Sequence, residues 1–174
     1  MHVRTFSHVR TLLVGAALAA VVVALSACGG DSNANSVSTQ SLQHQADLYA
    51  IDQIERKWHK SISRKDIDLM MTLWAQNGTF TVGPGQTLTG KDQIRRFWVN
   101  DVFPKTPPWV LDTPAYKIRE TVSGDKGTLY FECDHIDLKT RKVIAVTASD
   151  MQVTRIDGRW VITNDVGSTP TLSD

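Results

Sequence analysis

The sequence predicts an α+β domain in which helices cover one face of an antiparallel sheet. Residues 127–168 form three long runs rich in β-branched and aromatic side chains, the pattern of a strand meander. The last two runs are joined by Asp157-Gly158, a pair that tolerates the positive φ angles of a two-residue hairpin. Helical patterns are confined to the chain before residue 103, so helices and strands are largely segregated along the sequence.

Three helices are expected before the meander. The longest runs from about His44 to Ile62, where apolar side chains recur at steps of three and four residues. A second covers residues 66–75, with Asp66 as its capping residue. A third starts after Gly90 and ends before the prolines of residues 104–108, which cannot continue a helix. The expected apolar faces are Leu48, Ile51, Ile54, Trp58 and Ile62; Ile67, Met70, Met71 and Trp74; and Ile94, Phe97, Trp98 and Val102.

The remaining strands are shorter. Residues 79–82 and 86–88 are expected to form a hairpin around Gly83-Pro84-Gly85. A stiff loop around Trp109 follows the third helix, and a strand carried by residues 116–122 leads into the meander. The predicted order is two helices, a short hairpin, a helix and four longer strands, without an internal repeat.

The N-terminus has the pattern of an export signal. Arg4 and Arg10 precede the apolar run of residues 12–25, which is followed by Ser26-Ala27-Cys28. The run is shorter than the about 20 residues that span a bilayer comfortably. Residues 25–28 resemble a bacterial lipobox, which implies removal of residues 1–27 and lipidation of Cys28. The alternative is an ordinary secretory signal with a chance cysteine.

Lipidation places the protein in the bacterial cell envelope, anchored to a membrane with its domain outside the cytoplasm. Residues 28–43, rich in Gly, Ser and Asn, are expected to be a flexible tether. Because the chain has two cysteines, Cys133 then has no disulfide partner. Without Arg4 and Arg10 the chain has 17 basic and 18 acidic residues, and this near-neutral balance argues against nucleic acid as a partner.

Three segments resemble the nuclear transport factor 2-like, or SnoaL-like, domain family: residues 73–80, residues 90–98 and residues 157–165. The resemblance covers residues 44–168 and leaves residues 169–174 as a C-terminal tail. It implies a cone-shaped fold, in which a curved sheet wraps around the first helix and encloses a pocket. It does not imply one reaction, because the family includes isomerases, cyclases, dehydratases and binding domains.

Strand alternation predicts which side chains face this pocket. In the first meander strand Leu129, Phe131, Cys133 and His135 are expected to face inward. His135 is therefore the candidate general base or ligand hydrogen-bonding group, and a surface position is the alternative. With a two-residue turn at Asp157-Gly158, the pairs Arg155–Trp160, Val153–Ile162 and Met151–Asn164 are expected, and Asp150 and Asp165 should share the outer face.

A metal site is not expected. His44 and His59 lie too far apart on one helix to share an ion. Asp134, His135 and Asp137 are close in sequence, but adjacent strand residues point to opposite faces. No cofactor-binding motif is present in the sequence either.

Together these observations favour binding over catalysis. Aromatic side chains are expected to line a pocket for a small apolar ligand, and residues 78–84, where the resemblance implies a carboxylate base in steroid isomerases, contain no acid. One alternative is an isomerase, cyclase or hydratase that uses His135. Another is an interaction module that forms a homodimer through an outer-face patch of Tyr130, Ile144, Val146 and Ala148. The expected pocket residues are Trp58, Trp74, Phe80, Trp98 and Phe131.

Overall fold

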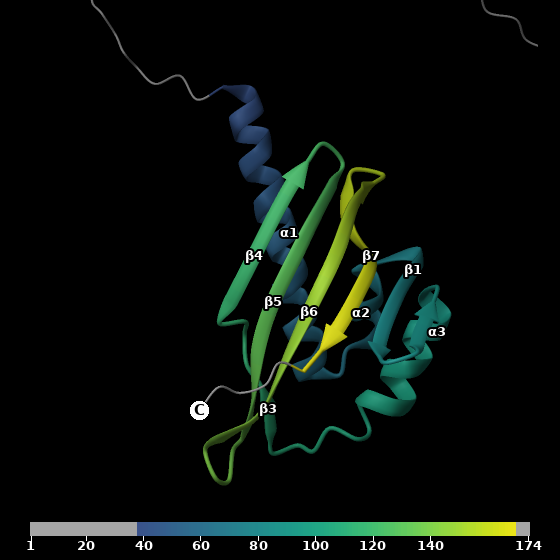
Figure 1. Cartoon of the computed structure of the whole chain (residues 1–174), viewed down its shortest axis with the longest axis vertical. Coiled ribbons are helices and arrows are strands. Elements are labelled where there is room, and N and C mark those ends of the chain that lie inside the picture. Colours follow the sequence, from purple (N-terminus) through teal and green to yellow (C-terminus); the bar gives the residue numbers. More distant parts are fainter. Residues whose placement is uncertain (1–37, 170–174) are drawn as a thin grey trace, which may run out of the picture. The chain divides into compact units, whose positions relative to one another are not determined.

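The computed structural model describes residues 38–169, and Cys28 and the expected signal peptide lie outside this range. The described chain forms a curved, open sheet of seven strands with its helices on one face and at one edge (Figure 1). None of the helices in this range is long and apolar enough to cross a membrane. The α+β class predicted from the sequence is confirmed.

The sheet is built mainly from the C-terminal meander. Its strand order is β2-β1-β7-β6-β5-β3, and β4 pairs with β5 beside β3. Only β1 and β7 run parallel; the other neighbours are antiparallel. The strands are β1 (Trp74–Gly83), β2 (Gln86–Thr89), β3 (Val110–Asp112), β4 (Lys117–Ser123), β5 (Lys126–Asp137), β6 (Lys142–Ile156) and β7 (Arg159–Ser168).

Helix α1 (Thr39–Arg64) packs along the concave face of the sheet. It starts at Ser38, whose hydroxyl accepts a hydrogen bond from the Ser41 amide, and it ends at Lys65 in the left-handed conformation. Residues 39–43, expected in the tether, are therefore helical. The correction follows from this cap, which the apolar periodicity alone does not reveal.

The other helices are short. Helix α2 (Ile67–Thr72) ends before the expected residue 75 because the Ile162 amide donates to the Leu73 carbonyl and Trp74 pairs with β7. Helix α3 (Lys91–Phe97) continues into the π-helix η1 (Trp98–Val102). Helix α3 lies next to β1 and β2, at the edge of the sheet away from β4 (Figure 1).

The β6–β7 hairpin has the predicted turn, with positive φ at both Asp157 and Gly158. The pairs Arg155–Trp160 and Val153–Ile162 are confirmed, but Met151 pairs with Asp165 instead of Asn164. A bulge beyond Ile162 inserts one extra residue into β7 and reverses the side-chain alternation there. Asp165 is consequently fully buried, and the expectation that it shares the outer face with Asp150 is wrong.

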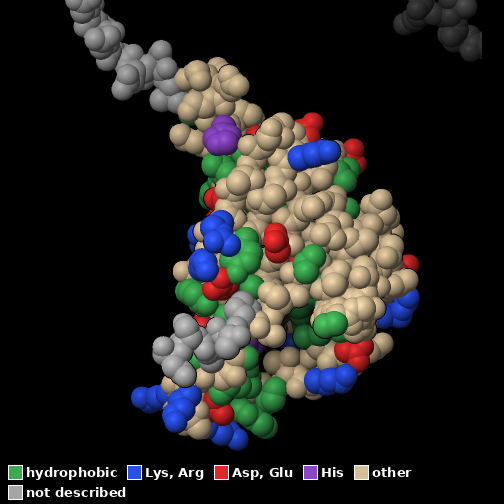
Figure 2. All heavy atoms as spheres, in the orientation of Figure 1, with side chains coloured by type: hydrophobic (Ala, Val, Ile, Leu, Met, Phe, Trp, Pro, Cys, Tyr) green, Lys and Arg blue, Asp and Glu red, His purple; other side chains and the backbone are tan. Residues whose placement is uncertain are grey.

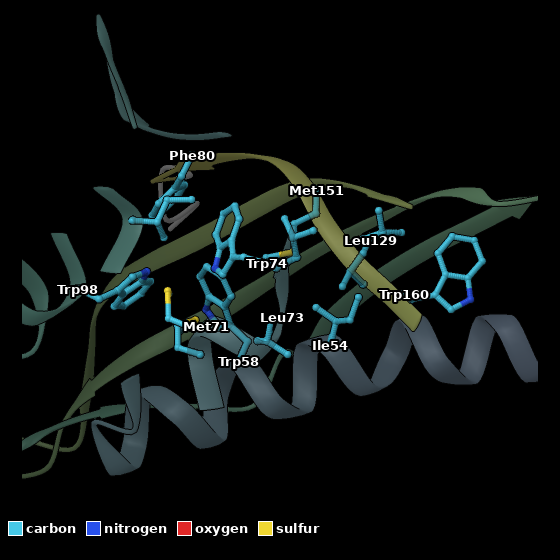
Figure 3. Packing of buried hydrophobic residues seen from close by; sticks show 14 of the residues in the cluster. Ile54, Trp58, Met71, Leu73, Trp74, Phe80, Trp98, Leu129, Met151 and Trp160 are labelled. Carbon is cyan, nitrogen blue, oxygen red and sulfur yellow. The ribbon is translucent and has the colours of Figure 1, made fainter. Parts of the chain in front are cut away.

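The core lies between α1 and the concave face of the sheet (Figure 3). Trp160 packs there, as its strand face predicts, and its indole nitrogen donates to Asp47 of α1 at 3.3 Å. At the other end of the cluster the rings of Trp58, Phe80 and Trp98 approach one another at 5.3 to 6.3 Å between centroids. Burial of these large apolar surfaces is the main source of stability in a domain without a described disulfide.

Candidate active site

A cavity of about 840 Å³ opens between the aromatic end of the core and strands β5 to β7. Its walls come from α1, the β1–β2 hairpin, α3 with η1, and the ends of the long strands. On the face drawn in Figure 2, acidic and basic side chains are interspersed, with no large area of one sign around the hollowed region. The size and the mostly apolar walls suit a small organic molecule.

Four of the five aromatic residues expected in the pocket line this cavity: Trp58, Phe80, Trp98 and Phe131. The fifth, Trp74, is only 1% exposed and does not reach the cavity. Its ring lies beneath β1, where a Cβ on Gly78 would be 3.0 Å from its Cε3 atom. Trp74 is therefore a core residue: it lies at the start of β1, which begins five residues before the expected strand of residues 79–82, and not at the end of the second helix.

The inner end of the cavity is polar. His135 faces inward as strand alternation predicts, and its Nε2 atom lies 3.0 Å from the Thr147 hydroxyl. The same atom is 3.7 Å from Oδ1 of Asp112, which β3 places directly opposite His135. The Cys133 sulfur is 3.2 Å from the Thr147 hydroxyl. Asp112 is the one carboxylate among the residues that line the cavity within the described range.

Behind Asp112 lies a second set of polar groups that is shielded from solvent. The Nδ1 atom of His59 is 2.8 Å from Asp112 Oδ2, and its Nε2 atom is 3.2 Å from Glu55 Oε1. Glu55 also accepts a hydrogen bond of 2.9 Å from the Ala115 amide. Glu55, His59 and Asp112 thus form a chain of acid–base groups that leads from α1 to the cavity.

The Cys133 thiol is in its protonated form at neutral pH. Burial, together with the nearby Asp112 carboxylate, raises the pKa of Cys133 to about 12. A thiol with such a pKa is a weak nucleophile by itself, because the thiolate is the reactive form.

A sequence model of the SnoaL-like domain matches residues 51–172. The chain belongs to the SnoaL-like family. This confirms the resemblance carried by residues 73–80, 90–98 and 157–165. No curated protein matches the chain.

Solved structures of other proteins share the fold of this SnoaL-like domain. An NTF2-like protein of unknown function from Pseudomonas putida is 15% identical, with a TM-score of 0.64 over 72% of this chain and 88% of its own. A hexachlorocyclohexane dehydrochlorinase from Novosphingobium barchaimii is 17% identical, with a TM-score of 0.63 over 76% and 92%. A candidate scytalone dehydratase from Novosphingobium aromaticivorans is 13% identical, with a TM-score of 0.61 over 73% and 86%.

Sequence reasoning placed His135 but missed the groups around it in this SnoaL-like domain. Asp112 lies in the region expected to be a loop, and no local pattern reveals the three-residue strand that aligns it with His135. The sequence pattern of His59 suggests no role beyond the excluded metal pair with His44. The one available clue was its position next to Trp58, on the helix face expected to be buried.

The outer face of the SnoaL-like sheet differs from the expected interaction patch. Val146 and Ala148 are 4% and 3% exposed, whereas Ile144 is exposed and Tyr130 is half-buried. The patch is therefore smaller than the strand alternation suggested. Formation of a homodimer through this face stays a prediction.

Proposed function

We propose that this SnoaL-like domain catalyses proton transfer on a small, largely apolar substrate, with Asp112 as the base and His135 as the proton donor. The observation that carries the proposal is the state of the Asp112 carboxylate. Its side chain is 6% exposed, it lines the cavity, and its Oδ1 atom has no hydrogen-bond partner in the described part of the chain. A buried carboxylate oxygen without a partner is costly to stability and is typical of a functional site.

The neighbours of Asp112 suit this role. The Nδ1 atom of His59, 2.8 Å from the other carboxylate oxygen, fixes the direction of the Asp112 side chain, as an orienting residue does for a catalytic base. His135 lies within 3.7 Å of the free oxygen and is 25% exposed toward the cavity. A base and a donor on one side of an apolar cavity permit proton removal and stabilisation of the charge that develops.

The reaction that fits this pair is an elimination or an isomerisation. Asp112 takes a proton from carbon, and the electron pair left behind forms a new double bond. In an elimination the leaving group departs with a proton from His135; in an isomerisation a proton returns at another carbon. The names of two structural relatives, a dehydrochlorinase and a candidate dehydratase, both denote eliminations and support this class by analogy of fold.

Deuterium exchange tests the proposal without knowledge of the natural substrate. The probes are small cyclic ketones with a β-hydroxyl or β-chloro substituent, followed by NMR in heavy water. Wild type should exchange the proton next to the carbonyl or form the unsaturated product. Asp112→Asn, which keeps the shape of the side chain, should lower this rate by about 10²–10⁴-fold, the usual contribution of a general base.

The matched control is Asp101→Asn, which removes an exposed carboxylate paired with Lys105. Probe affinity is followed by quenching of Trp58 and Trp98, which line the cavity. Equal rates in Asp112→Asn and Asp101→Asn would contradict the proposal. The proposal would also be contradicted if the ketone probes bind to the wild-type protein but exchange deuterium no faster than with Asp112→Asn.

That second result would favour the other candidate function, storage or transfer of a small apolar ligand. The aromatic wall of Trp58, Phe80, Trp98 and Phe131 supports it, because such a wall binds apolar molecules without any acid–base group. In that case His135→Ala should change probe affinity by no more than about 1–3 kcal/mol, the cost of one hydrogen bond.

We also propose that the protein works at a bacterial membrane, anchored by lipid on Cys28 with the domain outside the cytoplasm. The support is the apolar run that ends in Leu25-Ser26-Ala27-Cys28. An anchored domain with an apolar cavity is well placed to act on molecules that partition into the membrane.

A further inference from the structure

We propose that His59, Asp112 and Cys133 form a binding site for a divalent cation of the zinc class at the inner end of the cavity. Nitrogen, oxygen and sulfur atoms of these three side chains all lie within 4.8 Å of one another. They come from α1, β3 and β5, so only the folded domain brings them together. This inference goes beyond the proposed proton transfer and does not depend on it.

The spacing of the ligand atoms is close to that of a tetrahedral site. Bonds of about 2.0–2.3 Å from zinc to nitrogen, oxygen and sulfur place ligand atoms roughly 3.5 Å apart. Here Nδ1 of His59 and Oδ2 of Asp112 are 2.8 Å apart, and the largest separation in the trio is below 4.8 Å. Side-chain movements on the order of 1 Å therefore suffice to complete the site.

The surroundings of His59 support the same role. Metal-binding histidines usually direct their second ring nitrogen at a carboxylate or a carbonyl, which fixes the ring and its tautomer. Nε2 of His59 lies 3.2 Å from Glu55 Oε1 without a hydrogen bond among the described residues, and Glu55 is itself held by the Ala115 amide, so a small rotation of the ring would complete this contact. In the free domain a proton on Nδ1 can bridge His59 and Asp112 Oδ2. When the cation binds, it replaces this proton between the two ligand atoms, and the proton of the neutral ring then lies on Nε2, which faces Glu55.

The ligand types select the kind of cation. Thiolate and imidazole favour zinc and similar borderline-soft ions, whereas magnesium and calcium prefer a shell of oxygen atoms. Cys133 loses its thiol proton to solvent when the cation binds, because only the thiolate is a ligand. The free oxygen of Asp112 and the cavity beyond it leave a fourth position open to water or to a small molecule, next to His135.

The cation and the proposed base use the same carboxylate. With the cation bound, Asp112 is a ligand and cannot accept a proton from a substrate. The loaded domain is therefore a different functional state from the free one. Measuring cation binding needs no substrate, so its failure and the failure of the proposed catalysis are separate results.

Cobalt titration of the full chain tests the site, with Co²⁺ as a coloured substitute for Zn²⁺. All proteins carry Cys28→Ala, so that Cys133 is the single cysteine. One equivalent of Co²⁺ should produce the near-ultraviolet charge-transfer band of a cobalt thiolate, and one equivalent of Zn²⁺ should remove it. Cys133→Ser should abolish this band, and Asp112→Asn and His59→Gln should each weaken binding by at least tenfold.

The matched control is His44→Gln, which removes an exposed histidine of the same helix and should leave the titration unchanged. Circular dichroism establishes that each variant is folded. If His59→Gln fails to fold, Cys133→Ser still tests the site, because serine is nearly isosteric with cysteine. Absence of the band in the folded Cys28→Ala protein would overturn the proposal. A band that survives in Cys133→Ser, or equal affinity in Asp112→Asn and His44→Gln, would also overturn it.

Discussion

Asp165 of β7 is a carboxyl group in the core. It is fully buried, its Oδ2 atom is 3.4 Å from the Ser149 hydroxyl, and its Oδ1 atom has no partner among the described residues. Burial raises the pKa of Asp165 well above its usual range, although the contact with Ser149 opposes this shift. The side chain is thus neutral at acidic pH, and its ionisation at higher pH destabilises the folded domain.

Asp165→Asn should stabilise the domain at neutral pH. In the unfolded chain the carboxyl group titrates near pKa 3.9, and in the folded domain the pKa is higher. Between these two values the folded state binds more protons, so wild-type stability is greatest at the acidic end and falls as the pH rises through the folded pKa. The amide of the variant cannot ionise. In thermal melts, the melting temperature of Asp165→Asn relative to wild type should therefore increase from pH 4 to pH 7.

The control for this comparison is Asp101→Asn, at an exposed position where the same chemical change should leave the pH profile unaltered. Parallel melting curves for Asp165→Asn and wild type across this pH range would mean that Asp165 is solvated in solution.

The same residue marks the limit of sequence reasoning at this scale. Strand alternation correctly placed Phe131, Cys133 and His135 inside, because β5 is regular up to His135. It misplaced Asp165, because one extra residue in β7 reverses the alternation of side chains. No residue near Thr163 has a sequence pattern that predicts this bulge. A single such shift moved a carboxyl group from the expected surface into the core.

At the scale of elements, the long strands were predictable and the short ones were not. Residues of β5, β6 and β7 carry strong β patterns, and the Asp157-Gly158 turn sets the pairing of β6 with the start of β7. Strand β3 has only three residues and lies in a region expected to be a loop. These residues form a strand because they pair with β5. The candidate site needs β3 to supply Asp112, so the part of the site with the least local pattern was the part missed.

At Gly127, strand β5 lies close to both β4 and α1. A Cβ there would lie 2.5 Å from the Thr121 carbonyl oxygen of β4 and 3.0 Å from Cδ1 of Ile51 on α1. Gly127→Ala should therefore separate β4 from β5 or push against α1, with a loss of about 1–3 kcal/mol in the free energy of unfolding. Urea denaturation measures this loss.

Gly83→Ala is the control, since a Cβ at Gly83 meets nothing within 4 Å. It should differ from wild type by less than about 0.5 kcal/mol, as is usual for surface substitutions. Equal stabilities for the two variants would show that β4 moves away from Gly127 at no cost.

At the scale of the whole molecule, the apolar cavity has two kinds of wall with different origins. The aromatic wall has two sources in the sequence pattern: helical periodicity places Trp58 and Trp98, and strand patterns place Phe80 and Phe131. These four residues were predictable for that reason. The polar end combines groups from α1, β3, β5 and β6. Some of these groups are far apart in the sequence: His59 and Asp112 are separated by more than 50 residues. Such groups meet only through the complete topology, which one sequence does not specify.

The proposed lipid on Cys28 would determine where this cavity works. Cys28→Ala should leave the protein unprocessed or release it from the membrane fraction, because the proposed anchor depends on a thioether-linked lipid at this cysteine and stable anchoring needs more than one acyl chain. Cell fractionation and the mass of the mature N-terminus measure both effects. Cys133→Ser is the matched control, since it removes the other cysteine, which is buried in the domain, and should stay membrane-bound. If Cys28→Ala remains in the membrane fraction at the mature size, then an ordinary signal or a protein contact, and not lipid, determines the location.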